Sequence, residues 1–368
     1  MDDRASEPAV SAPPDSPTSR TSRREALGQI GMLGLGAIGA LTPFSAPDEA
    51  SASTRQQSKP FRILAFCGGG IRGIASAAML QRLARRSPKI VSEADMLAGT
   101  SVGASVISLL LANLSPREVY RYLTTGPPQF FKNPNTDPKR PAFDIEGLLA
   151  AQRQLHPDNP SLNQLKKKVL LTSFNVGDSH HDWHAVLFNN FRKSTTGHAS
   201  LIEAVLSSGA MPGELGSYKG HIDGAFVNHD PTLAAIALAV DDGVKLEDIV
   251  VICFGTGFMG DWIASDTSHW GADQWQHGNG DQRNRTPSTL INGSDSPVLS
   301  AALDGPSTNL APELSRMMLG GRYAYLNPTL ARYIPEDDTD PADLAYLEAQ
   351  ANKVDISAAA ALSKRYWR

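Results

Sequence analysis

The sequence predicts an α/β protein, built as a three-layer α/β/α sandwich around a mainly parallel central sheet. Two observations point to this class. Short runs such as Phe61–Cys67 and Ile249–Phe254 are apolar throughout, which is typical of strands buried on both faces. Segments with helical spacing alternate with them, and this alternation favours a parallel sheet covered by helices. Hydrophobic residues make up 41% of the 368 residues, so a sizeable core can form.

The expected elements follow one another along the chain as strand and helix. The first strand ends in glycines and precedes a helix, and a second, shorter strand precedes an Ala- and Leu-rich helix without proline. The expected strands are residues 61–67, 96–98, 169–174, 183–188 and 249–254. The expected helices are residues 74–83, 102–114, 201–206 and 231–240. The last of these opens with Pro231, a residue favoured in the first turn of a helix.

These elements predict one main domain with flanking regions. The alternating strands and helices occupy residues 61–260. Residues 261–298 are rich in Asp, Gly, Ser, Thr and Asn, which predicts a polar loop or insertion. From residue 299 to 368 the pattern is helical again, apart from a break at Pro335–Asp338. We therefore expect a helical C-terminal extension that packs on the main domain.

The N-terminal region has the composition of a targeting segment. Residues 1–52 combine a Pro- and Ser-rich opening, the pair Arg23–Arg24, the uncharged apolar run Ile30–Leu41 and the small residues Ala50–Ala52. This order is typical of a twin-arginine-type signal peptide behind a disordered N-terminus, and it leaves 53–60 as a linker. A retained membrane anchor is the alternative, but the run of about 12 residues is shorter than the roughly 20 that span a bilayer. We expect export to a periplasmic or extracellular location.

The first motif with chemical meaning is Gly99-Thr100-Ser101-Val102-Gly103, which lies between a short strand and a buried helix. A serine on such a turn projects its hydroxyl from the sheet edge, and flanking glycines let the backbone turn tightly beneath it. The N-terminal amides of the following helix point at the same place. The motif predicts Ser101 as a nucleophile, with Gly99 and Gly103 forming its elbow.

The second motif is Gly68-Gly69-Gly70-Ile71-Arg72-Gly73, directly after the first strand. Successive glycines leave backbone N–H groups unshielded, so that these groups can converge on an anion. In acyl transfer that anion is the oxygen of the tetrahedral intermediate. We therefore predict an oxyanion hole formed by Gly68, Gly69 and Gly70, with Arg72 adding charge or fixing the loop.

The same glycines also match G-x-G-x-x-G, the fingerprint of dinucleotide-binding folds. Glu93 lies about 20 residues further on, where a ribose-binding acid could sit. However, the stretch Pro88–Ala94 is a poor strand, and this alternative leaves the Ser101 motif unexplained. The phosphate-binding Walker pattern is excluded because no Gly-Lys-Ser/Thr follows the glycines.

The third motif, His221-Ile222-Asp223-Gly224-Ala225, supplies a candidate base for the serine. A buried carboxylate has a raised pKa and accepts a proton more readily. Asp242-Gly243 and Asp304-Gly305 show the same dipeptide, but the first is a helix-exit turn and the second lies in a loop. Apolar residues follow Asp223, so Asp223, Gly224 and Ala225 are expected near the core as the proton-acceptor motif. The alternative is that Asp223 is a plain turn residue.

In this order the three motifs resemble those of the patatin-like phospholipase family, which carries D-G-G-G-x-R-G, then G-x-S-x-G, then D-G-G or D-G-A. The chain shows the corresponding stretches at Cys67–Gly73, Gly99–Gly103 and Asp223–Ala225. Weaker similarities lie at Ser207–Pro212, Asn228–Pro231 and Cys253–Gly257. The resemblance covers about Phe61–Gly257. It departs from the family at Cys67, where an Asp is usual, and this puts in doubt how the glycine loop is braced.

The resemblance implies a patatin-like catalytic domain at residues 61–260 and a serine acyl-ester hydrolase of the lipid acyl hydrolase or phospholipase A type. In this chain it implies a dyad of Ser101 as nucleophile and Asp223 as base, with Gly68–Gly70 as oxyanion donors and Arg72 beside them. A lipid or fatty-acyl ester is the implied substrate, and a transient contact with a membrane or lipid surface would accompany it.

Other functions stay open beside this one. A catalytically silent lipid-binding protein on the same fold would account for the departure at Cys67. An acyltransferase would use an alcohol in place of water in its second step. A dinucleotide-binding protein is the remaining alternative. The acyl chain length, the head group, the positional preference and the oligomeric state do not follow from the residues.

Composition adds expectations about cofactors and partners. No cofactor or metal is expected, because the histidines and cysteines lack metal-binding spacing. Cys67 and Cys253 lie in apolar runs, where thiols are more often inert core residues than partners in a disulfide. The net charge of -4 provides no basic surface that would favour nucleic acid.

Overall fold

The computed structural model describes residues 59–137, 139–177, 182–258, 260, 262–284, 289–290, 294–305 and 309–367. The contacts divide the chain into the units Met1–Gln56 and Gln57–Arg368, and the described residues all belong to the second. The predicted signal peptide at 1–52 and most of the predicted linker at 53–60 lie outside the described residues.

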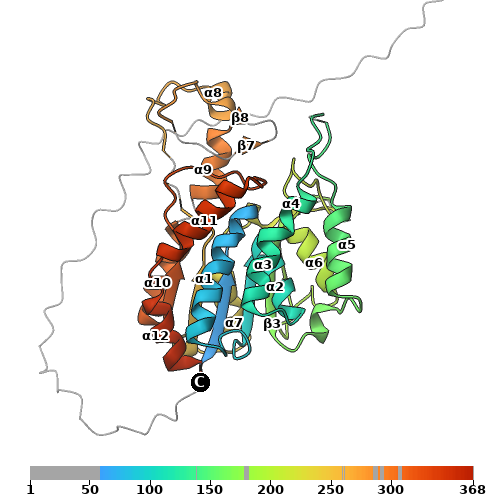
Figure 1. Cartoon of the computed structure of the whole chain (residues 1–368), viewed down its shortest axis with the longest axis vertical. Helices are drawn as coiled ribbons and strands as arrows, with labels where there is room; N and C mark the ends of the chain where they lie inside the picture. The colour runs from blue at the N-terminus through green and yellow to red at the C-terminus, as the bar shows by residue number, and fades with distance from the viewer. Residues whose placement is uncertain are drawn as a thin grey trace, which may run out of the picture. The chain divides into compact units, whose positions relative to one another are not determined.

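A seven-stranded sheet forms the centre of the fold (Figure 1). Its strands are β1 (Phe61–Phe66), β2 (Met96–Thr100), β3 (Lys168–Asn175), β4 (His184–Asn189), β5 (His221–Asp223), β6 (Ile249–Phe254) and β9 (Tyr323–Leu326). The order is β4-β3-β2-β1-β6-β9, and β5 also pairs with β3. All neighbours are parallel except β4 and β5, which run antiparallel to β3. This confirms the predicted α/β class with a mainly parallel sheet.

Side chains of the strands alternate between two buried faces. In β1, Leu64 and Phe66 belong to the core on one face, and Ile63 and Ala65 belong to the core on the other. Helices cover both faces, so the central strands β1, β2 and β6 are buried on both sides and consist almost entirely of apolar residues. This burial is the physical reason why the central strands could be recognised in the sequence.

The helices form the outer layers of the sandwich. On one face lie α1 (Gly73–Arg86), α2 (Val102–Leu111), α3 (Pro116–Thr125), α6 (Leu201–Ser208) and α12 (Ser357–Tyr366). On the other face lie α7 (Thr232–Asp241) and α10 (Ala311–Leu319). Further helices are α4 (Pro127–Phe130), α5 (Glu146–Leu155), α8 (Ala272–His277), α9 (Pro297–Gly305) and α11 (Pro341–Lys353). The helices α3, α4 and α5 were not among the predicted elements.

The end of the chain takes part in the sheet as well as in the helical layer. In the region 299–368, predicted to be helical, β9 pairs in parallel with β6. A strand this short carries too little pattern to be distinguished from a helix. The Arg82 guanidinium of α1 donates to the carbonyls of Ala351 and Val354, which ties α1 to the end of α11. The region 261–298, predicted as a polar loop, also contains α8 and the short strands β7 (Thr289–Leu290) and β8 (Ser294–Asp295).

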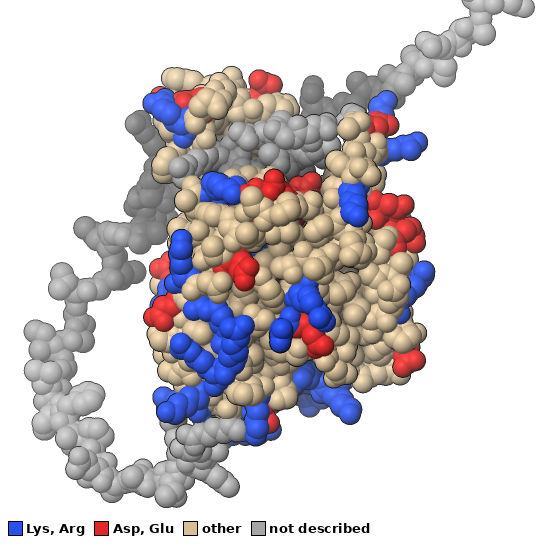
Figure 2. All heavy atoms as spheres, in the orientation of Figure 1, with Lys and Arg blue, Asp and Glu red and all other residues tan. Residues whose placement is uncertain are grey.

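Charged side chains on the visible face have a structural explanation. Figure 2 shows Lys and Arg side chains gathered over the lower part of this face, with acidic side chains among them. The last turns of α1 and α12 carry the basic residues Arg85, Arg86, Lys364 and Arg365. Cations at helix C-termini interact favourably with the helix dipole. Among the described residues, no helix is both long enough and apolar enough to cross a bilayer.

Candidate active site

Ser101 occupies the turn between β2 and α2, where its backbone adopts an unusual conformation. Its φ angle is 54° and its ψ angle is −121°, a region that residues other than glycine seldom occupy. Strain of this kind accompanies the sharp strand-to-helix turns that present a nucleophile. The Ser101 amide donates to Ser208 Oγ at 2.9 Å, so the turn is also held from the end of α6.

The glycines on either side of Ser101 let the strand and the helix approach closely. A Cβ atom at Gly103 would lie 2.2 Å from the carbonyl oxygen of Phe66, and one at Gly99 would lie 2.6 Å from the backbone of Gly103. Both distances are far below van der Waals contact, so a larger residue at either position would displace the backbone. The predicted elbow glycines therefore have a steric reason to be glycine.

The pairing of β3 brings Asp223 next to Ser101. Thr100, the last residue of β2, pairs with Thr172 of β3. The next residue of β3, Ser173, pairs with Asp223 at the end of β5. The short strand β5 thus continues the row of β2 along the same side of β3, and Asp223 lies where β2 gives way to Ser101. Residues more than a hundred positions apart meet through this register.

Asp223 is a buried carboxyl group with one unpaired oxygen. The residue is 1% exposed, and its Oδ1 accepts a hydrogen bond from the Ala225 amide at 2.7 Å. Oδ2 has no hydrogen-bond partner of ordinary geometry among the described residues. Burial raises the pKa of Asp223 to about 7, although the Ala225 amide and the Ser101 hydroxyl both lower it. The Ser101 hydroxyl thus lies near enough to affect the carboxyl, and the other motif residue, Gly224, lies against Thr172.

The glycine loop crosses the end of the sheet beside Ser101. Gly69 and Gly70 have φ angles of 136° and 52°, which only glycine adopts readily. The Gly68 amide donates to the carbonyl of His229 at 2.9 Å, and the Ile71 amide donates to the carbonyl of Glu336 at 2.6 Å. Among the described residues, the amides of Gly69 and Gly70 make no such bond. Of the three predicted oxyanion donors, these two are therefore available and Gly68 is engaged.

The Arg72 side chain holds the glycine loop through contacts with Gly69 and Glu336. Its Nη2 lies 2.6 Å from Glu336 Oε1, and both side chains are largely buried. Its Nε donates to the carbonyl of Gly69 at 3.3 Å, and its guanidinium lies 5.8 Å from the centre of the Tyr333 ring. The charge that was predicted beside the oxyanion hole is thus paired with a carboxylate from the C-terminal region. That segment, which the sequence did not link to the site, lies over the glycine loop.

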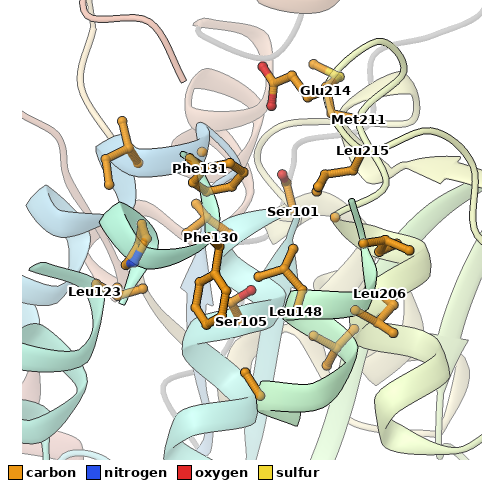
Figure 3. Close-up of a pocket in the computed structure, with 18 of the residues that line it drawn as sticks. Ser101, Ser105, Leu123, Phe130, Phe131, Leu148, Leu206, Met211, Glu214 and Leu215 are labelled. Atoms are coloured by element: carbon orange, nitrogen blue, oxygen red, sulfur yellow. The ribbon is translucent and has the colours of Figure 1, made fainter. Parts of the chain in front are cut away.

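An apolar cavity opens beside Ser101 (Figure 3). Its lining includes Leu123, Phe130, Phe131, Leu148, Leu206 and Leu215. These side chains come from α3, α4, α5 and α6 and from the segments that follow α4 and α6. The sequence did not indicate this cavity, because α3, α4 and α5 were not predicted and an apolar lining has no sequence motif. The lining of the cavity is mainly apolar.

Carboxyl groups gather at the same cavity. Glu214 and Glu336 both line it, and in the view of Figure 3 the Glu214 side chain lies above the Ser101 side chain. Burial raises the pKa of Glu214 well above its ordinary value, and the carboxylates of Glu336, Asp337 and Asp223 raise it further. The charge of Arg72 acts in the opposite direction. The site therefore carries protonatable groups beyond Asp223, and no motif in the sequence marked them.

The structure does not place Glu93 where a dinucleotide-binding fold would need its ribose-binding acid. Glu93 lies in a turn region that precedes β2, and no strand forms over residues 88–94. Its carboxylate lies 2.9 Å from the Arg62 guanidinium, in an ion pair at the start of β1. Glu93 is therefore committed to a contact at the opposite end of β1 from the glycine loop.

A second polar cluster lies behind the glycine loop, on the other face of the sheet. It consists of Cys67, Asp230 and Cys253, whose ligand atoms all lie within 4.8 Å of one another. Both cysteines are free thiols, and burial raises the pKa of the Cys253 thiol well above its ordinary value. Among the described residues, this is the group of side chains that could hold a metal ion.

Comparisons with known proteins agree with this geometry. The family model described as patatin-like phospholipase matches residues 64–236, an interval that contains the glycine loop, Ser101 and Asp223. CotR of Bacillus subtilis is 29% identical over 319 residues, covering 83% of this chain and 98% of CotR. The protein Teg of Priestia megaterium is 29% identical over 329 residues, covering 83% of this chain and 99% of Teg. Patatin-like protein 2 of Oryza sativa is 24% identical over 312 residues, covering 69% of this chain and 72% of that protein. Residues 64–236 therefore match the patatin-like phospholipase family, as the motifs of the chain predicted.

Proposed function

We propose that the protein is a serine acyl-ester hydrolase of lipid or fatty-acyl esters, with Ser101 as nucleophile and Asp223 as its base. One observation carries the proposal: a hydroxyl on a strained turn and a buried carboxyl group with a pKa of about 7 meet at one sheet edge, beside an apolar cavity. The match of residues 64–236 to the patatin-like phospholipase family supports the reaction class. The apolar lining supports a fatty-acyl group as the part of the substrate that is bound.

The reaction proceeds in two steps. Asp223 accepts the proton of Ser101 as Oγ attacks the acyl carbonyl carbon. The amides of Gly69 and Gly70 stabilise the negative oxygen of the tetrahedral intermediate. The bond to the alcohol then breaks, and the alcohol leaves with the proton from Asp223. In the second step Asp223 takes a proton from water, the hydroxide attacks the acyl carbonyl, and the proton returns to Ser101 as the fatty acid leaves.

Covalent labelling tests the proposal directly. A fluorophosphonate carrying an alkyl chain should modify the protein once, and peptide mapping should place the adduct on Ser101. Prior incubation with a long-chain ester should slow the labelling, because both molecules would occupy the apolar cavity. A protein that binds lipid without reacting with it would stay unlabelled, and labelling at another serine would refute the assignment of the nucleophile.

Activity should depend on pH through Asp223. Only the ionised carboxylate can accept a proton, and its pKa in the free protein is about 7. The value of kcat/KM for a neutral ester should therefore fall about tenfold for each pH unit below about 7 and reach a plateau above it. The measurement is initial rates at low ester concentration across a buffer series of constant ionic strength. A profile that stays level down to pH 5 would exclude Asp223 as the base.

Replacing Glu336 should shift this profile. The Glu336 carboxylate raises the pKa of Asp223, because a nearby negative charge disfavours ionisation. In Glu336→Gln that charge is lost, so the midpoint of the kcat/KM profile should move to lower pH. The matched control is Glu313→Gln, an exposed carboxylate on α10, which should leave the midpoint where it is. Equal midpoints in all three proteins would contradict the proposed coupling.

We also propose that the protein is exported. The pair Arg23–Arg24 ahead of the apolar run Ile30–Leu41 supports this proposal, as do the small residues Ala50–Ala52. Residues 1–52 fused to a reporter that must fold before export should carry it out of the cytoplasm. Changing both arginines to lysine should retain the reporter inside, and export that is indifferent to this change would refute a twin-arginine route.

A further inference from the structure

The cluster of Cys67, Asp230 and Cys253 takes no part in the proposed reaction. Its three side chains are brought together by adjacent strands of the sheet and the segment before α7. Cys253 lies in β6, paired in register with Ala65 of β1. Cys67 follows β1, and its amide donates to the carbonyl of Phe254 at 3.0 Å. Two adjacent parallel strands thus bring the thiols together on the face covered by α7. Asp230 reaches the same point from the segment that leads into α7, and all three residues are buried.

Two of the three distances within the cluster fit the edges of a small tetrahedral metal site. Cys67 Sγ and Cys253 Sγ are 3.6 Å apart, and Cys253 Sγ and Asp230 Oδ1 are 3.5 Å apart. Zinc binds thiolate at about 2.3 Å and carboxylate at about 2.0 Å, so the corresponding edges of a tetrahedral site are about 3.8 Å and about 3.5 Å. The third edge, between Cys67 Sγ and Asp230, lies within 4.8 Å, so an ion could enter once these two groups approach to about 3.5 Å.

Unpaired polar atoms surround the same point. Asp230 Oδ1 also accepts from the Thr232 amide at 2.8 Å, whereas Asp230 Oδ2, Thr232 Oγ1 and Tyr323 Oη are buried and have no hydrogen-bond partner of ordinary geometry among the described residues. The ion pairs between described residues do not include Asp230 either. A buried carboxyl group without a cation or a full set of hydrogen bonds costs stability. A bound cation would satisfy the carboxylate, and the hydroxyl groups are candidates for a fourth ligand.

A disulfide is a poorer account of the same cluster. It would require the two sulfur atoms to move from 3.6 Å to about 2.05 Å apart. It would also remove the Cys253 thiol as a donor to Asp230 Oδ1, which would keep only its bond from the Thr232 amide, and Asp230 Oδ2 would stay without a partner. A ligand set of two sulfurs and one oxygen in tetrahedral arrangement is instead one that zinc accepts.

We propose that Cys67, Asp230 and Cys253 form a structural zinc site that braces the glycine loop from behind. On binding, the ion would displace the two thiol protons to solvent and leave both sulfurs as thiolates. Cys67 directly precedes Gly68, whose amide donates to the carbonyl of His229, next to Asp230. Thr256, three residues after Cys253, donates from its hydroxyl to the carbonyl of Gly68 at 2.5 Å. The ion would join the three segments that hold Gly68.

Metal content tests the site without reference to activity. The full chain is produced without a metal-affinity tag in zinc-supplemented medium, and zinc per chain is measured by mass spectrometry after exhaustive dialysis. Wild-type protein should carry about one zinc ion. Asp230→Asn and Cys253→Ala should carry almost none. Ser207→Ala is the matched control, since Ser207 is also a buried residue with an unpaired oxygen, but lies on α6 on the opposite face, and it should keep its zinc.

Cobalt provides a readout that needs no variant. Protein produced in cobalt-supplemented medium should show a thiolate-to-cobalt charge-transfer band in the near ultraviolet and intense visible bands typical of tetrahedral Co²⁺. Wild-type protein that holds no more zinc than Cys253→Ala and lacks the cobalt bands would overturn the proposal. A disulfide between Cys67 and Cys253 found by peptide mapping would overturn it as well. Fluorophosphonate labelling of Ser101 is measured separately, so failure of the zinc site is distinguishable from failure of the proposed hydrolase.

Discussion

Ser101→Ala is expected to lower ester hydrolysis by about 10⁴- to 10⁶-fold while the protein stays folded, since the proposed acyl intermediate forms on the Ser101 hydroxyl. The backbone at Ser101 keeps its positive φ in the variant, and only one hydroxyl is lost, so unfolding free energy should change by less than about 1 kcal/mol. The measurements are kcat on a fatty-acyl ester and the urea unfolding midpoint.

Ser105 offers a control for this prediction. It lies on α2 one helical turn after Ser101 and lines the same cavity. Because Ser105 is not on the strained turn, Ser105→Ala should reduce kcat by no more than about tenfold. If Ser101→Ala retains most of the activity, or if Ser105→Ala loses as much as Ser101→Ala, Ser101 is not the nucleophile.

Asp223→Asn is expected to lower kcat by about 10²- to 10⁴-fold, because an amide cannot accept the Ser101 proton. The amide oxygen can still accept the hydrogen bond from the Ala225 amide, so the local geometry should persist. Fluorophosphonate labelling should slow in parallel with ester hydrolysis. Normal hydrolysis by this variant would show that another group, such as Glu214, takes the proton.

The same variant should change how stability depends on pH. The pKa of Asp223 rises from 3.8 to about 7 on folding, so the folded state holds more protons than the unfolded state between these values. Stability is therefore lost as the pH rises through this window, by up to about 4 kcal/mol, and the loss is complete above about pH 7.

Asn does not titrate, so Asp223→Asn should lack this loss. Its unfolding free energy relative to the wild type should increase between pH 4 and pH 8, as measured by urea denaturation at both values. A difference that is constant with pH would mean that folding does not raise the pKa of the Asp223 carboxyl group. The expected result is a stability cost at a functional residue, which proteins often tolerate at their active sites.

Much of this protein follows from local pattern. The central strands could be predicted because burial on both faces requires continuous apolar runs, and β1 and β6 show this directly. The elbow around Ser101 and the glycine loop could be predicted because their steric demands admit only glycine at defined positions. The match of residues 64–236 to the patatin-like phospholipase family followed from the order of these motifs.

Other features depend on residues that are distant in sequence and were decided only by tertiary structure. Asp223 meets Ser101 because both β2 and β5 pair with β3, and β5 has too few residues to show a strand pattern. Glu336 reaches Arg72 from the C-terminal region, and two strands bring Cys67 to Cys253. A sequence indicates where the backbone can turn, which segments are buried and which side chains are reactive, because these are properties of neighbouring residues. Which of them finally touch is set by strand register and packing, which involve the whole chain at once.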